Sequence, residues 1–273
     1  METFKEHPRI KKGKITPMYK EGNEGGFRDF LIQNSYFATC LDRRPLYWGK
    51  LLRLLYGEGR LYVYASIVED IVDKFSFLFL SKDQIISIEG ELNWSKRFYI
   101  KYYTYTFVYL TKSLLDSLAV FINEIFKLGF SGGDIDFKKG NFMDGLKIKN
   151  QKLADLINKR KNWIDTVVKY RDNLIHRHGL YVGPCPEVPP ELKDEAEINM
   201  FILKEPYYLP NNPNLVEDIV YKNKEGELIK LTCFLEEWIN ESSALFDIVL
   251  GTFAENFTRE KWFIKNLPLL KDL

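Results

Sequence analysis

The residues best suited to chemistry lie in one short segment, Tyr170-Arg171-Asp172-Asn173-Leu174-Ile175-His176-Arg177-His178-Gly179, which holds two of the three histidines of the chain. A histidine can accept or donate a proton near neutral pH, and a guanidinium can bind a phosphate through two parallel hydrogen bonds. His176 could therefore take the proton of a ribose 2′-hydroxyl or protonate a leaving oxygen, while Arg171 stabilises charge on the phosphate. Asp172 could orient the imidazole. These residue types predict cleavage of RNA without a metal ion.

The apolar periodicity predicts that this segment ends a helix running from about Asn150 to His178. On a continuous helix counted from Leu153, Arg171 falls at about 0°, in the middle of the stripe that faces the core. A guanidinium buried there would need an anionic partner, because leaving it unpaired costs several kcal/mol. Asp172 and His176 are four residues apart, so they can form a hydrogen bond on the flank of the helix.

The spacing of Arg171 and His176 raises a geometric difficulty, because five residues place them about 140° apart on an ideal helix. Either the end of the helix distorts, or a second copy of the chain contributes across a two-fold axis. The alternative is structural. Arg171 could pair with a buried acid such as Asp116 and hold two helices together, with His176 and His178 as ordinary residues at a helix end.

The distribution of charge favours an anionic partner more than the net charge of +1 does. The segment from Lys138 to Arg177 contains eleven Lys/Arg against four Asp, and the segment from Glu187 to Glu241 contains thirteen Asp/Glu against five Lys. This asymmetry predicts one basic and one acidic face. A basic face attracts a phosphate backbone. The candidate RNA-binding residues are Lys161, Lys169, Asn173, Arg177 and His178.

Metal and redox chemistry have little support in the sequence. The three cysteines, Cys40, Cys185 and Cys233, form no CxxC pair and are expected to be reduced, buried thiols. The three histidines do not form an obvious metal site, because His7 lies near the start of the chain. We therefore expect no metal and no cofactor.

The remaining sequence predicts the helices that position this segment. Residues 1–25 resemble a flexible tail, and shorter helical stretches begin near Phe27 and Pro45. Longer helices are expected over Leu61–Phe79, about Ser95–Lys127 and about Thr232–Phe257. The second of these is apolar nearly all round, as is typical of the central helix of a bundle. A loop containing Lys138 and Lys139 should follow it.

Residues 180–230 differ in composition, because Pro184, Pro186, Pro189 and Pro190 disfavour helix. Short strands are expected over Ile198–Leu203 and Asp218–Tyr221, with a turn at Glu225–Gly226 leading into Leu228–Leu231. The prediction is thus a mainly α helical bundle over residues 26–273, with a small β-containing insertion at about 180–230 between the last two long helices. With a polar, lysine-rich Met1–Lys20 and no long apolar run, we expect a cytoplasmic protein without a membrane span.

The Arg-polar-x-x-x-His pattern near the end of a helix, in an aromatic-rich bundle, resembles the HEPN superfamily. That resemblance implies a helical bundle acting as a homodimeric, metal-independent ribonuclease, in which Arg171 and His176 are catalytic and Asp172 assists. The family more often has Asn at the position of Asp172. The resemblance also implies a setting as a toxin or in defence against phage, with a neutralising protein partner as one possibility. The alternative is a non-catalytic helical interaction module that mediates dimerisation or partner binding.

Overall fold

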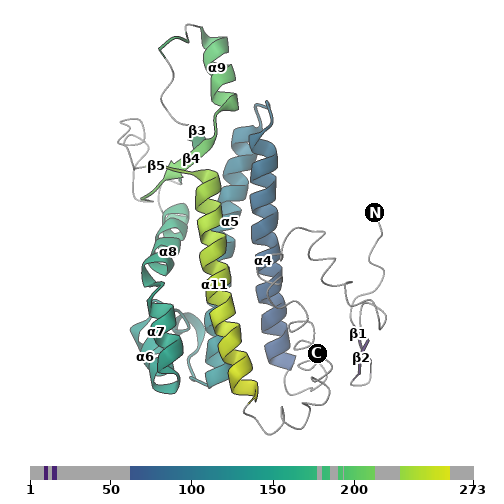
Figure 1. The fold of residues 1–273 in the computed structure, drawn as a ribbon, viewed down its shortest axis with the longest axis vertical. Coiled ribbons are helices and arrows are strands. Elements are labelled where there is room, and N and C mark those ends of the chain that lie inside the picture. Colours follow the sequence, from purple (N-terminus) through teal and green to yellow (C-terminus); the bar gives the residue numbers. More distant parts are fainter. Residues whose placement is uncertain are drawn as a thin grey trace. The chain divides into compact units, whose positions relative to one another are not determined.

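The computed structural model describes the residues 9–11, 14–16, 62–176, 180–184, 190–192, 194–212 and 228–258. Over these residues the protein is mainly α, with seven α-helices and a small three-stranded sheet placed in the sequence between the last two long helices (Figure 1). The predicted fold class is confirmed at this level. The predicted helical stretches near Phe27 and Pro45 lie outside the described residues.

The chain divides into two compact units. The first unit comprises Met1–Ser76, Asp116–Ile157 and Ser243–Leu273, and the second comprises Phe77–Leu115 and Asn158–Ser242. Three long helices contribute residues to both units: α4 (Tyr62–Glu89), α5 (Lys96–Phe126) and α11 (Leu231–Thr258).

The first unit is held together by aromatic side chains and by a pair of hydrogen bonds from Asn123. It also contains α6 (Gly140–Lys149), nearly all of α7 (Gln151–Asn158), the short 3-10 helix η2 (Gly132–Asp134), and the hairpin of β1 (Arg9–Lys11) and β2 (Lys14–Thr16). The rings of Phe75 and Phe246 lie 5.0 Å apart, and those of Phe130 and Phe142 lie 5.6 Å apart. The side chain of Asn123 donates to the Phe130 carbonyl and accepts from its N–H, both at 3.2 Å. This exchange fastens the loop that follows α5.

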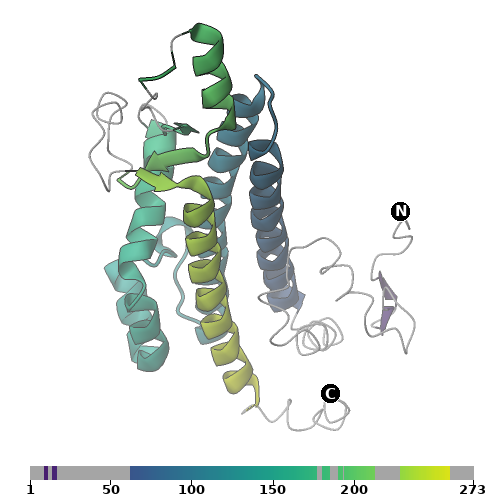
Figure 2. The same cartoon turned by 45° about the horizontal axis from the view of Figure 1, so that its top comes forward.

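The second unit contains α8 (Lys161–His176), α9 (Glu195–Lys204) and the sheet. Its strands are β3 (Gly183–Pro184), β4 (Tyr207–Pro210) and β5 (Leu228–Lys230), antiparallel in the order β3-β4-β5. Tyr208 pairs with Gly183 on one side and Lys230 on the other. Helix α11 begins at Leu231, directly after β5, so the strand continues into the helix without a linking residue (Figure 2).

A buried lysine joins two helix ends in the second unit. Lys96 is 1% exposed, and its ammonium donates to the carbonyls of Glu89 and Leu203, each at 2.6 Å. These carbonyls lie at the carboxyl ends of α4 and α9, where helices leave acceptors without a partner inside the helix and where a positive charge is favourable. One side chain therefore caps both helices.

One of the predicted β-strands is a helix in the structure. Ile198–Leu203 is helical, within α9, because the Asp194 side chain accepts a hydrogen bond from the N–H of Glu197 at 2.7 Å and so caps the helix. The prediction of a strand there was wrong. Asp218–Tyr221 lies outside the described residues. The strand predicted over Leu228–Leu231 is confirmed as β5, and its partner within the described sheet is β4.

The long helices follow the predicted pattern with changed boundaries. The helices expected over Ser95–Lys127 and Thr232–Phe257 are confirmed as α5 and α11, and α4 continues ten residues beyond the predicted end at Phe79. The single helix expected from Asn150 is instead α7 and α8, separated by a turn at residues 159–160. Helix α6 occupies part of what was predicted as loop.

Two further expectations concern solvent. Cys233 is exposed, so the prediction that it is buried was wrong, while Cys40 and Cys185 lie outside the described residues. Among the helices that the structure describes, α5 is the one long and apolar enough to cross a membrane, but 61% of its apolar window is buried inside the protein. That burial is typical of the core helix of a soluble domain.

Candidate functional site

Helix α8 carries the motif and presents one face to the core. Ile164, Val167, Val168 and Tyr170 are at most 4% exposed. The Tyr170 hydroxyl donates to the Pro210 carbonyl at the end of β4, which fixes α8 against the sheet. Burial, and next the Glu237 carboxylate, raise the pKa of Tyr170 well above that of an ordinary tyrosine.

Arg171 follows Val167 and Val168 on this face at helical spacing, and it is half-buried. Its side chain is 29% exposed, and its Nη1 lies 3.2 Å from the Oδ1 of Asp172. Its Nε is buried and has no hydrogen-bond partner among the described residues. The anionic partner expected for Arg171 is thus its immediate neighbour, a carboxylate 48% exposed, and much of the donor capacity of the guanidinium is left for another acceptor.

The other motif residues are placed to different extents. His176 is the last residue of α8, which agrees with its expected place in the final turn, but its side chain lies outside the described part of the chain. The predicted hydrogen bond from Asp172 to that imidazole therefore stays a prediction. Arg177 and His178 also lie outside the described residues.

The predicted RNA-binding residues on α8 differ in exposure. Lys161 and Lys169 are exposed, so their charges are available to an anion in solution. Asn173 is 7% exposed, and its amide lies on the buried side of the helix. The roles of all three residues in RNA binding remain predictions.

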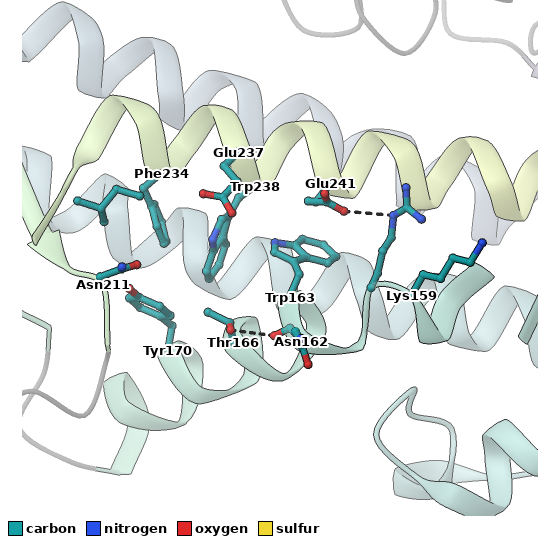
Figure 3. A pocket seen from close by; sticks show the side chains of 12 residues that line it. Lys159, Asn162, Trp163, Thr166, Tyr170, Asn211, Phe234, Glu237, Trp238 and Glu241 are labelled. Atoms are coloured by element: carbon teal, nitrogen blue, oxygen red, sulfur yellow. Dashed lines mark hydrogen bonds and ion pairs between the residues drawn. The ribbon is translucent and has the colours of Figure 1, made fainter. Parts of the chain in front are cut away.

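A pocket of about 530 Å³ lies between α8 and α11 within the second unit. Figure 3 shows Trp163 and Tyr170 of α8 facing Phe234 and Trp238 of α11. The rings of Phe234 and Trp238 are 4.2 Å apart, and those of Trp163 and Trp238 meet edge to face at 6.5 Å. The pocket therefore has an aromatic floor, and its volume falls within the range of about 300–1,000 Å³ typical of small-molecule sites.

Polar groups of opposite charge line the same pocket. Arg160 and Glu241 form an ion pair, with Nε and Oε2 3.1 Å apart. Lys159 lies beside this pair, whereas Glu237 lies toward the end formed by Phe234 and Tyr170 (Figure 3). The indole N–H of Trp163 is buried and finds no hydrogen-bond acceptor in the described part of the chain. A buried donor of this kind is uncommon and points to a missing partner.

The sequence alone does not predict this pocket, because Trp and Tyr residues at helical spacing are more typical of a core than of a binding site. Tyr170, Phe234 and Trp238 are indeed buried, at 1–2% exposure, whereas Trp163 is only half-buried. The available signal was a pair of stripes, Trp163 with Tyr170 and Phe234 with Trp238, each at helical spacing. The sequence does not show that these two stripes, about seventy residues apart, face each other.

No cluster of three or more His, Cys, Asp or Glu side chains suited to a metal ion occurs within the described ranges. No family model, curated protein or solved structure matches this chain.

Proposed function

We propose that this protein is a metal-independent RNA endonuclease of the HEPN type. The observation that carries the proposal is Arg171, a half-buried guanidinium five residues before the histidine that ends α8, with a buried Nε that bonds to no described residue. The Asp172 carboxylate, its ion-pair partner, is 48% exposed, so a phosphate can replace it. A guanidinium held by packing and not consumed by a buried ion pair suits the binding of a scissile phosphate.

The reaction is transesterification by the ribose 2′-hydroxyl. The 2′-oxygen attacks the adjacent phosphorus and gives up its proton to a base, the bond from phosphorus to the 5′-oxygen breaks, and that oxygen takes up a proton. The products are a 2′,3′-cyclic phosphate and a 5′-hydroxyl. His176 accepts or delivers one of these protons, Arg171 neutralises the phosphoryl oxygens, and Asp172 orients the imidazole.

The proposal includes a homodimer that acts on RNA in the cytoplasm. A second α8 across a two-fold axis would supply the histidine that one helix places about 140° from its own Arg171. Exposed Lys161 and Lys169, together with Arg177 and His178, would guide the RNA. A role as a toxin or in phage defence, with a neutralising protein partner, belongs to the same proposal.

A second candidate function is a non-catalytic interaction module, and one specific observation favours it. Phe98, Tyr102 and Tyr109 are 70%, 56% and 40% exposed, and their spacing of four and seven residues places them on one face of α5. Exposed aromatic stripes are typical of surfaces that bind another protein. In that function Arg171 would organise a dimer without cleaving RNA.

Incubating the purified protein with mixed RNA in EDTA distinguishes the two functions. The parent should release fragments that end in cyclic phosphate, while Arg171→Ala and His176→Ala should lose at least about 100-fold in rate. Arg171→Lys keeps the positive charge but loses the two parallel donors of the guanidinium, so its cleavage rate should lie between those of the parent and Arg171→Ala. Arg97→Ala, at an exposed arginine of α5, is the matched control and should cleave like the parent. Intact RNA with every variant, together with loss of dimers in Arg171→Ala by light scattering, would establish the interaction module instead.

A further inference from the structure

The pocket between α8 and α11 has no part in the chemistry proposed for Arg171 and His176, although it shares their helix. Tyr170, at one end of the pocket, is the residue immediately before Arg171. Because consecutive residues of a helix point about 100° apart, the pocket and the Arg171 guanidinium face different directions from α8.

The lining of the pocket limits the class of ligand. Trp163 is only half-buried, so part of its indole is open to a ring that stacks on it. The N–H of the same indole is a buried donor without a described partner, which calls for an acceptor on the ligand. The ligand must then be planar and must carry at least one hydrogen-bond acceptor near its edge.

The Glu237 carboxylate supplies the opposite requirement. Glu237 is exposed, and among the described residues no hydrogen bond or ion pair engages its carboxylate, which lies near the Trp238 ring (Figure 3). Its neighbour Glu236, by contrast, pairs with Lys82 at 3.5 Å. A carboxylate has two acceptor oxygens side by side, and it binds best a group that presents two adjacent donors.

The charged side chains are spread unevenly along the pocket. Glu237 lies toward Tyr170 and Phe234, whereas Lys159 lies at the opposite end, where the Glu241 carboxylate pairs with Arg160 (Figure 3). An organic cation would suit the first end but would meet Lys159 at the other. Because Glu241 offsets the charge of Arg160, Lys159 supplies the net positive charge at that end, and a planar ring that carries a phosphate suits both ends.

We propose that this pocket binds a guanine base, with the phosphate of the same nucleotide directed toward Lys159. The N1–H and N2–H of guanine are adjacent donors that match the two oxygens of Glu237, and its O6 and N7 are acceptors available to the indole N–H of Trp163. Adenine, cytosine and uracil do not present two adjacent donors on one edge. Stacking on Trp163 adds affinity without selectivity. The assignment of this base to an RNA strand rests on the proposed function, whereas the pocket and its preference do not.

Calorimetric titration with the four nucleoside 5′-monophosphates tests the inference. GMP should bind at least about 10-fold more tightly than AMP, CMP or UMP, because guanine alone offers two adjacent donors to the Glu237 carboxylate together with an acceptor for the buried indole N–H of Trp163. Glu237→Gln should weaken GMP binding by about 10- to 100-fold and leave AMP unchanged. Glu236→Gln, one residue along the same helix and outside the pocket, is the matched control and should bind like the parent. Trp163→Phe, which keeps a ring and removes the N–H, should weaken GMP binding by about 10-fold.

A single-stranded DNA oligonucleotide with one dG, compared with the same strand carrying dA, separates the sources of the base, because DNA has no 2′-hydroxyl and is not cleaved. Tighter binding of the dG strand than of GMP identifies a strand as the ligand, and the reverse identifies a free nucleotide. Equal binding of all four nucleotides, no binding of GMP or the dG strand, or equal effects of Glu237→Gln and Glu236→Gln would overturn the inference. Guanine binding through Glu237 in a protein that leaves RNA intact would refute the nuclease alone, and cleavage without guanine preference would refute the pocket alone.

Discussion

The guanidinium of Arg171 meets the carboxylate of the next residue, Asp172, with Nη1 and Oδ1 3.2 Å apart. Both side chains are partly exposed, at 29% and 48%, so water screens their attraction. The contact holds the guanidinium loosely, and it lowers the positive charge that Arg171 offers to an anion.

Asp172→Asn is therefore expected to bind RNA more tightly. Removing one negative charge beside the guanidinium should raise affinity by on the order of 2- to 10-fold at low salt, and the gain should shrink as salt screens it. Fluorescence anisotropy in a His176→Ala background, which prevents cleavage, measures this effect. Asp165→Asn, seven residues earlier on α8, is the control. Unchanged or weaker binding would show that Asp172 does not act on Arg171, and a cleavage assay in the His176 protein separately tests whether Asp172 orients the imidazole.

Two buried tyrosines of the second unit should respond in opposite directions to loss of the hydroxyl. Tyr170 donates to Pro210, so Tyr170→Phe leaves a buried carbonyl unpaired and should lower the free energy of unfolding by about 1–2 kcal/mol. The Tyr207 hydroxyl is buried and bonds to none of the described residues, so Tyr207→Phe should be neutral or should stabilise by up to about 1 kcal/mol. Urea unfolding at pH 7 measures both. Equal losses would mean that the Tyr207 hydroxyl has a partner.

The same two residues predict a loss of stability in alkali. Burial raises the pKa of Tyr207 to about 12 and that of Tyr170 further still, whereas in the unfolded chain both are near 10. Above pH 10 the unfolded chain releases protons that the folded protein retains, so the free energy of unfolding falls as pH rises from 10 toward 12. Each Tyr→Phe variant should reduce that slope. An unchanged slope would show that these hydroxyls ionise normally.

Lys96→Met should be among the more damaging changes in the second unit. It removes the donor that joins the carbonyls of Glu89 and Leu203, at an expected cost of about 2–4 kcal/mol. Desolvation lowers the pKa of Lys96, and the nearby Glu89 opposes this shift. Between the pKa of the folded protein and 10.5, the unfolded chain therefore binds more protons at this lysine than the folded protein does. The stability of the parent should therefore rise relative to Lys96→Met as pH increases toward 10.5. Lys82→Met removes a surface ion pair of 3.5 Å and should change stability by less than about 0.5 kcal/mol at any pH.

Asn123→Ala should destabilise the first unit. Asn123 is 5% exposed and exchanges two hydrogen bonds with the backbone of Phe130, so its loss leaves a partly buried N–H and carbonyl unpaired and should cost about 2–3 kcal/mol. Asn150→Ala removes one bond of 3.0 Å to the N–H of Leu153 at the start of α7 and should cost about 1 kcal/mol. Thermal unfolding of both variants gives the comparison. A smaller loss for Asn123→Ala would show that solvent satisfies the Phe130 backbone.

The sequence predicts the elements whose pattern is long and repeated. Apolar residues at helical spacing over some thirty positions identify α5 and α11 without any knowledge of their neighbours. The break between α7 and α8 has no such signal, because Lys159, Arg160 and Lys161 are good helix formers and no Gly or Pro marks the turn. Asp194 is a residue type that favours a helix start, but the apolar run that follows it also fits a β-strand.

The candidate site shows the same limit. The spacing of Arg171 and His176 can be read directly, and so can the place of His176 at the end of its helix. Whether a guanidinium on the core-facing stripe is buried or half-buried depends on what covers it, which no spacing encodes. The pocket required knowledge that Trp163 and Trp238 face each other, a tertiary contact that neither stripe predicts alone.

Because β5 continues directly into α11, backbone exchange in β5 should depend on whether the pocket is occupied. Phe234, Glu237 and Trp238 lie in the first two turns of α11, which begins directly after β5. A ligand that reduces the motion of these side chains should therefore also reduce the motion of the β5 residues Leu228–Lys230. A bound ring should slow the exchange of backbone amide hydrogens for deuterium across Leu228–Lys230, and an empty pocket should leave it fast. Mass spectrometry of a peptide that covers Leu228–Lys230 would then measure the fraction of molecules whose pocket is occupied.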